Sequence, residues 1–202
     1  MATKTMKSAT KASVEATPLV FRDQKEWASW LNEHHRTSPG LWLRIGKKGA
    51  ALESLSYAEA LEVALCYGWI DGQKRASEDA SWLQRFTPRG PNSVWSRINR
   101  DKAEDLIRSG RMKPAGLDAI ERAQENGRWE SAYDSARRAA VPRDFQSALN
   151  ESRKAKSFFS TLDRANRYAI LWRLQTAKRP ETRARKIQEF IRMLERRKKI
   201  HK

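Results

Sequence analysis

The stretch SYAEALEVALCYGWIDGQK, residues 56–74, passes from a helical pattern to an extended one and decides the fold class. Ser56 and Glu59 have the spacing of a capping box, in which the two side chains satisfy backbone N–H groups at the start of a helix. Gly68 stands where a glycine commonly ends a helix. The pattern therefore predicts a helix from about residue 57 to 67, which the chain leaves in extended form from Trp69 to Asp71.

The extended segment places an acidic side chain, Asp71, directly after the large apolar residues Trp69 and Ile70. Strand alternation predicts that Asp71 points to the same side as Trp69 and away from Ile70. An unpaired carboxylate is very costly to bury. Asp71 must therefore be solvated, paired with a cation or positioned for a ligand.

Two further segments have the pattern of strands. Residues 41–45, LWLRI, alternate apolar side chains with Trp and Arg, and residues 82–89, WLQRFTPR, lie within hairpin reach of the Asp71 segment. On the second of these strands, Arg85, Thr87 and Arg89 share one face. We expect an antiparallel sheet of about three strands with helices packed against one side.

Helical patterns account for most of the remaining chain. Asp23 has the position of an N-cap before one amphipathic helix, and Ser93 has that position before another, which extends to Ser109. Pro114 starts a further helix. A small, polar segment at residues 131–144 has the composition of a linker, and beyond it all patterns are helical.

The predicted fold is therefore α+β, mainly α-helical, with a small antiparallel sheet and a helical C-terminal unit. We expect a disordered basic tail at residues 1–16, an α+β core domain at residues 17–135 and a basic helical unit at residues 136–202.

Composition excludes several classes of protein. The single cysteine, Cys66, rules out an intramolecular disulfide framework, and three histidines make a histidine metal cluster improbable. No run of eighteen apolar residues is present. The first sixteen residues have no apolar run of the kind that a secretory signal requires, although transit peptides share their basic, serine-containing composition. We expect a cytoplasmic protein without a metal or cofactor.

The formal net charge of +17 is the strongest compositional signal. Such a field attracts nucleic acid, acidic proteins or anionic lipid headgroups without specifying which. The excess of basic residues is greater in the second half of the chain. The residues that we expect to contact phosphates or another anionic partner are Arg183, Arg185, Lys186, Arg196 and Arg197. The alternative is a solvated basic helix face.

The polar residues of the central segments form one candidate ligand site. Its members are Trp69, Asp71, Arg85, Thr87, Arg89, Ser93, Trp95 and Asn99. Arginine forks clamp phosphate or carboxylate groups, and a helix that begins at Ser93 would add free backbone N–H groups, so an anionic ligand is expected. Alternatively, Asp71 pairs with Arg85 or Arg89 only to hold the hairpin together.

Several blocks of the chain resemble a known bacterial family. The YdeI/OmpD-associated family, also described as the bacteriocin-protection or OmdA-type family, is similar to the succession WLRIGKK, SYAEALEVALCYGWIDGQK, RFTPRGPNSVWSRIN, GRMKPAG and NGRW. The C-terminal block AKRPETRARKIQEFI is similar to the end of the family's domain. The resemblance extends over nearly all of residues 20–195. It implies a link to an outer-membrane porin and to survival under antimicrobial peptides or bacteriocins, and it supplies no catalytic residue.

Taken together, these features favour a non-enzymatic protein, associated with stress or antimicrobial-peptide resistance, that binds an anionic partner. A nucleic-acid-binding protein that uses the basic C-terminal half is the first alternative. A small-molecule enzyme with a site around Asp71 is the second.

Overall fold

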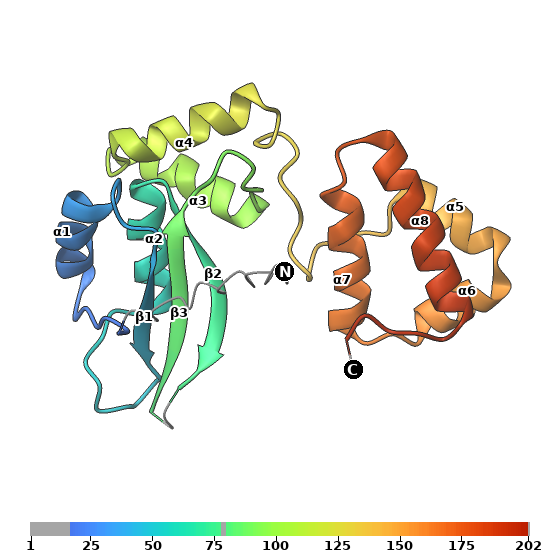
Figure 1. Ribbon diagram of the computed structural model, residues 1–202, viewed down its shortest axis with the longest axis horizontal. Coiled ribbons are helices and arrows are strands. Elements are labelled where there is room, and N and C mark those ends of the chain that lie inside the picture. Colours follow the sequence, from blue (N-terminus) through green and yellow to red (C-terminus); the bar gives the residue numbers. More distant parts are fainter. Residues whose placement is uncertain (1–16, 78–79, 202) are drawn as a thin grey trace, which may run out of the picture. The chain divides into compact units, whose positions relative to one another are not determined.

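The computed structural model describes residues 17–77 and 80–201 of the chain, so the predicted tail at residues 1–16 lies outside the described residues. The described residues form eight helices and three strands, in agreement with the predicted α+β class (Figure 1). The elements are α1 (Gln24–His34), β1 (Leu41–Gly46), α2 (Tyr57–Cys66), β2 (Trp69–Ala76), β3 (Ser81–Pro88), α3 (Arg97–Arg108), α4 (Pro114–Glu125), α5 (Arg143–Glu151), α6 (Arg153–Ser160), α7 (Arg164–Gln175) and α8 (Pro180–Glu195).

The chain divides into two compact units. The first unit comprises the residues up to Ala64 together with Ile70–Pro88, and the second comprises Leu65–Trp69 and Arg89–Lys202. The predicted domain boundary near residue 135 differs from this division and stays a prediction. Within the described part of the chain, no helix is both long and apolar enough to cross a membrane.

The capping signals around α2 act as predicted. The Ser56 backbone N–H donates to Glu59 Oε2 at 2.8 Å, and the Glu59 N–H donates to Ser56 Oγ at 3.3 Å, which completes the capping box. The hydrogen bond that the Glu59 carboxylate accepts from the Ser56 backbone N–H lowers the pKa of Glu59 below its ordinary value. At the other end, Gly68 has φ +70°, a left-handed conformation that glycine adopts without a steric penalty. The helix predicted at residues 57–67 is therefore confirmed.

The three strands form one sheet in the order β1-β3-β2 (Figure 1). β1 and β3 are antiparallel, with Leu41 opposite Phe86 and Ile45 opposite Trp82. Directly opposed residues lie on the same face of a sheet, so the alternating apolar side chains of both strands lie on a common face. The predicted sheet of about three strands is confirmed.

Trp27 anchors helix α1 in the core of the first unit. Its side chain is fully buried, its indole N–H donates to the carbonyl oxygen of Ala60 on α2 at 3.1 Å, and its ring lies 5.9 Å from that of Phe86 on β3. A buried indole N–H needs such a partner. One side chain therefore joins α1, α2 and β3.

Helix α3 begins later than the sequence indicated. Its N-cap is Ser96, whose Oγ accepts from the Asn99 N–H at 3.1 Å, whereas the Ser93 N–H donates to Gly90 in a turn. Ser96 also forms an isolated parallel bridge with Tyr133, far along the chain. This bridge holds the residues before Ser96 in extended form, so the prediction of a Ser93 N-cap was wrong.

The C-terminal helices α5 to α8 have their own apolar core, as their amphipathic patterns predicted. Helix α8 contacts α5, α6 and α7, and α5 contacts α6. The buried members of this core are Phe145, Leu149, Ala155, Phe159, Leu162, Ile170, Leu171, Leu174, Phe190 and Leu194. Phe145 and Phe159 meet edge to face with centroids 5.5 Å apart, a favoured aromatic geometry.

Candidate functional site

The structure distributes the predicted ligand site over both units. Asp71, Arg85 and Thr87 belong to the first unit, whereas Trp69, Arg89, Ser93, Trp95 and Asn99 belong to the second. Trp69 is fully buried, so it does not line an open cleft. Asn99 is buried on α3. That these eight residues form one ligand site stays a prediction.

Asp71 has a neutral partner. Its carboxylate accepts a hydrogen bond from the hydroxyl of Tyr57 on α2 at 2.9 Å. Asp71 and Arg85 are both described, and they form no ion pair with each other. The Arg85 guanidinium instead lies 5.9 Å from the Trp42 ring centroid. The hydrogen bond joins the start of α2 to β2. It gives the carboxylate that follows Trp69 and Ile70 a hydrogen-bond partner.

Arg89, Ser93 and Trp95 are the predicted site residues that the structure brings together. The Arg89 guanidinium lies 3.5 Å from the Trp95 ring centroid and donates to the Val94 carbonyl oxygen at 3.3 Å. With Ser93 they line a void of only about 10 Å³. A space of this size holds at most one water molecule, and the contacts of Arg89 hold the segment before α3 in place.

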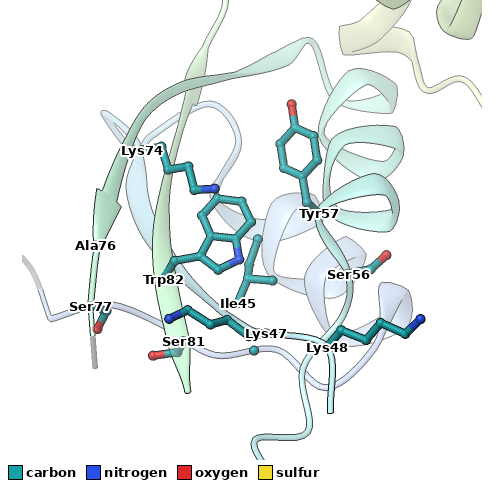
Figure 2. Close-up of a pocket in the computed structure, with 11 residues that line it drawn as sticks. Ile45, Lys47, Lys48, Ser56, Tyr57, Lys74, Ala76, Ser77, Ser81 and Trp82 are labelled. Atoms are coloured by element: carbon teal, nitrogen blue, oxygen red, sulfur yellow. The ribbon is translucent and has the colours of Figure 1, made fainter. Parts of the chain in front are cut away.

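A larger cavity lies elsewhere in the first unit. It has a volume of about 880 Å³ and lies beside the end of β1, the start of β3 and the start of α2 (Figure 2). We call it the lysine cavity. The residues that line it are Ile45, Gly46, Lys47, Lys48, Ser56, Tyr57, Lys74, Ala76, Ser77, Ser81 and Trp82.

Three ammonium groups give the lysine cavity its electrostatic character. Lys47 and Lys48 follow β1, and Lys74 comes from β2. None of the three forms an ion pair with a described residue, and none of the described lining residues is acidic. Cations gathered around a concave surface attract anions.

Aromatic side chains form the apolar part of this cavity. Figure 2 shows the Lys74 amine turned toward the Trp82 indole, and Nζ lies 4.1 Å from the ring centroid. The Tyr57 ring is 5.9 Å from that of Trp82. A cation held over an aromatic face remains able to bind an anion with its other N–H groups. The cavity therefore combines positive charge with a flat apolar surface.

The backbone around Gly46 explains why the lysines lie at this edge. The Gly46 N–H donates to Ser54 Oγ at 2.8 Å, and the Lys47 N–H donates to the Ala80 carbonyl at 2.9 Å. A Cβ on Gly46 would lie 2.8 Å from the Leu52 carbonyl oxygen. Glycine at the end of β1 thus lets the loop fold back, so that Lys47 lies beside β3.

Two features of the sequence lie at this cavity but do not identify it by themselves. The run GKKG at residues 46–49 places two lysines between glycines directly after a strand. Trp82 alternates with Gln84 and Phe86 on β3, which assigns it to the same face as the core. Only the pairing of Trp82 with Ile45 shows that this tryptophan lies beside the GKKG run.

The predicted phosphate-contacting residues of α8 have different environments. Arg183 forms a bidentate pair with Asp144, with N–O distances of 2.6 and 2.9 Å, and this hydrogen-bonded pair raises the pKa of Arg183 and lowers that of Asp144. Lys186 donates to the Arg173 carbonyl oxygen at 3.3 Å. These two side chains therefore attach α8 to its neighbours.

The remaining three residues of that prediction, Arg185, Arg196 and Arg197, are exposed. Arg185 forms an i,i+4 pair with Glu189 at 3.7 Å. That the five predicted residues contact phosphates or another anionic partner stays a prediction.

Comparison with protein families matches two parts of the chain. Residues 19–119 match the model described as Domain of unknown function (DUF8412), and residues 129–197 match that described as Bacteriocin-protection, YdeI or OmpD-Associated. No curated protein and no solved structure matches the chain. The YdeI/OmpD-associated resemblance is thus confirmed for residues 129–197, whereas the GWIDG and FTPR blocks lie in the part that matches the domain of unknown function. The chain therefore belongs to the domain family DUF8412, and its residues 129–197 carry a match to the bacteriocin-protection, YdeI or OmpD-associated model.

Proposed function

We propose that this protein is a non-enzymatic binding protein whose lysine cavity holds an anionic ligand that carries a flat apolar group. The observation that supports the proposal is the cavity of about 880 Å³, in which Lys47, Lys48 and Lys74 surround the indole of Trp82. Sites for small molecules are typically about 300–1,000 Å³, mostly apolar, with a few polar groups that fix orientation.

The ligand class follows from the lining groups. Lysine ammonium groups donate up to three hydrogen bonds each and accept none, so they select carboxylate, sulfonate or phosphate oxygens. Trp82 and Tyr57 provide area against which a ring of the ligand can pack. The three lysines that line the cavity would repel a cationic ligand.

We extend this proposal to resistance against bacteriocins or antimicrobial peptides, because the description of the matched family names bacteriocin protection. A chain with net charge +17 repels cationic peptides, which argues against their direct sequestration. An anionic partner is the chemically consistent one. A cytoplasmic location is part of the same proposal.

The test is a fluorescence titration with 1-anilinonaphthalene-8-sulfonate, an anionic aromatic probe. We expect saturable binding that weakens at least about tenfold in the triple variant K47Q/K48Q/K74Q, since each lost charged hydrogen bond costs about 1.5–3 kcal/mol. The matched control is K25Q/K113Q/K156Q, which removes the same charge at exposed lysines that do not line the cavity.

Equal weakening in the two triple variants would show that the probe responds only to net charge. Unchanged binding in K47Q/K48Q/K74Q would place the probe outside the cavity. Either result contradicts the proposal. Trp82→Leu tests the aromatic surface separately, because it keeps all three charges, and we expect it to weaken binding as well.

A further inference from the structure

A second cavity lies among the C-terminal helices, in the part of the chain that matches the YdeI/OmpD-associated family. It has a volume of about 380 Å³ and lies where α6 packs against α8. We call it the α6–α8 cavity. Its lining residues are Arg153, Lys154, Ser157, Phe158, Glu195 and Arg197.

The α6–α8 cavity presents unpaired positive charge. Arg153, Lys154 and Arg197 are exposed, and none of them forms an ion pair with a described residue. The one carboxylate in the lining, Glu195, accepts a hydrogen bond from Ser152 Oγ at 2.7 Å. Three cations therefore face the cavity, and the single acidic group is already hydrogen bonded to a neighbour.

The backbone at Arg197 is a second, independent observation. Arg197 has φ 54°, and it is the one non-glycine residue with positive φ in the described part of the chain. Helix α8 ends in a Schellman motif at Arg197, in which the Lys198 N–H donates to the Met193 carbonyl oxygen at 3.0 Å. Helices α2, α3 and α4 are followed by a glycine with φ between 66° and 70° at the corresponding turn.

An arginine at such a turn costs backbone strain that a glycine avoids. Strain of this kind gathers where a side chain has a functional task. The Arg197 side chain lines the α6–α8 cavity together with Arg153 and Lys154, which links the strained residue to this cavity.

We propose that the α6–α8 cavity binds a phosphate group of single-stranded nucleic acid. Guanidinium groups form bidentate hydrogen bonds with phosphate oxygens. Phe158, a half-buried ring in the same lining, offers a surface for stacking of an adjacent base. Backbone phosphate contacts carry no base preference, so this binding is independent of sequence. The site is separate from the lysine cavity and does not depend on the function proposed for it.

The test measures fluorescence anisotropy of a labelled oligothymidylate at several salt concentrations. We expect R153Q/K154Q/R197Q to bind at least about tenfold more weakly at low salt and to lower the magnitude of the logarithmic salt slope by about 2, at about 0.7 per phosphate contact on a single strand. The matched control, R137Q/R138Q/R143Q, removes three exposed positive charges outside the cavity and is expected to stay within about twofold of the wild type.

Two outcomes overturn the proposal: absence of oligothymidylate binding by the wild type at low salt, and equal weakening in both triple variants. Binding of inorganic tripolyphosphate in place of oligothymidylate also overturns it, since the site would then take a small polyanion. Circular dichroism confirms that the variants remain folded.

Arg197→Gly separates binding from stability. Glycine adopts a positive φ without steric strain, so we expect an unchanged or higher melting temperature together with weaker oligothymidylate binding. Full binding by this stable variant would exclude Arg197 from the site and overturn the proposal.

Discussion

Replacement of Gly116 by alanine is predicted to destabilise the protein although it improves helix propensity. Gly116 lies in the first turn of α4 and is buried against the C-terminal end of α2. A Cβ at this position would lie closer than 3.0 Å to the carbonyl oxygens of Leu65 and Cys66 and to Met112 Sδ. The methionine side chain can move, but the two carbonyl groups belong to the backbone.

The magnitude follows from two opposing effects. Alanine is favoured over glycine inside a helix by about 1 kcal/mol. Inserting a methyl group into a closely packed contact costs up to about 3 kcal/mol. The Lys113 N–H donates to the Cys66 carbonyl oxygen at 3.2 Å, which holds the start of α4 near the end of α2 and limits relaxation. We expect a net loss of about 2 kcal/mol in the free energy of unfolding, taking the upper end of the packing cost.

Thermal denaturation followed by circular dichroism measures this loss. A change of about 2 kcal/mol corresponds to a fall of about 4–8 °C in the melting temperature for a chain of this size. Leu117→Ala, at an exposed position on the same helix, is the control and should change stability by less than about 0.5 kcal/mol. A melting temperature of Gly116→Ala equal to or above that of the wild type would refute the reasoning, because α4 could then move away from α2 at no cost.

Three further predictions concern ionisable groups. Burial raises the pKa of Tyr168 to about 12 and also raises the pKa of Tyr67, so ultraviolet titration should show late-ionising tyrosine, and Tyr168→Phe should reduce the part that titrates near pH 12. Hydrogen bonding to Arg183 lowers the pKa of Asp144, so the pair stabilises the fold above the unfolded pKa of about 3.9 and loses this effect as pH falls through the folded value. Asp144→Asn should therefore cost up to about 1 kcal/mol at pH 7 in denaturant titration, a partly exposed pair being screened, and the difference from wild type should shrink toward acid pH. Because Asp71 accepts a hydrogen bond from Tyr57, Asp71→Asn should cost no more than about 1.5 kcal/mol in the same assay, and a loss of 3 kcal/mol or more would indicate a buried ion pair instead.

Prediction of the binding residues was less successful than prediction of the elements. The density of basic residues predicts α8 as a contact surface, yet Arg183 pairs with Asp144, which lies 39 positions earlier in the chain. Arg153 and Lys154, which line the α6–α8 cavity with Arg197, follow a serine in an unremarkable helical pattern. Charge density alone cannot separate a cation that is paired within the fold from one that faces solvent.

The sequence by itself determined the elements whose signals are local. The capping box of Ser56 and Glu59 and the glycine at residue 68 set the limits of α2, because their hydrogen bonds and backbone angles involve residues a few positions apart. The alternation of apolar residues likewise identified β1 and β3, since side chains of a strand point to opposite faces in turn.

Only the tertiary structure decided which side chains meet. Helix α3 begins after Ser96 rather than after Ser93, because Ser96 forms a bridge with Tyr133. The lysine cavity exists because the pairing of β1 with β3 places Ile45 opposite Trp82. A shift of one residue in this pairing would turn Trp82 to the other face of the sheet. Such contacts join residues distant in the chain, and their geometry depends on the packing of whole elements rather than on any local pattern.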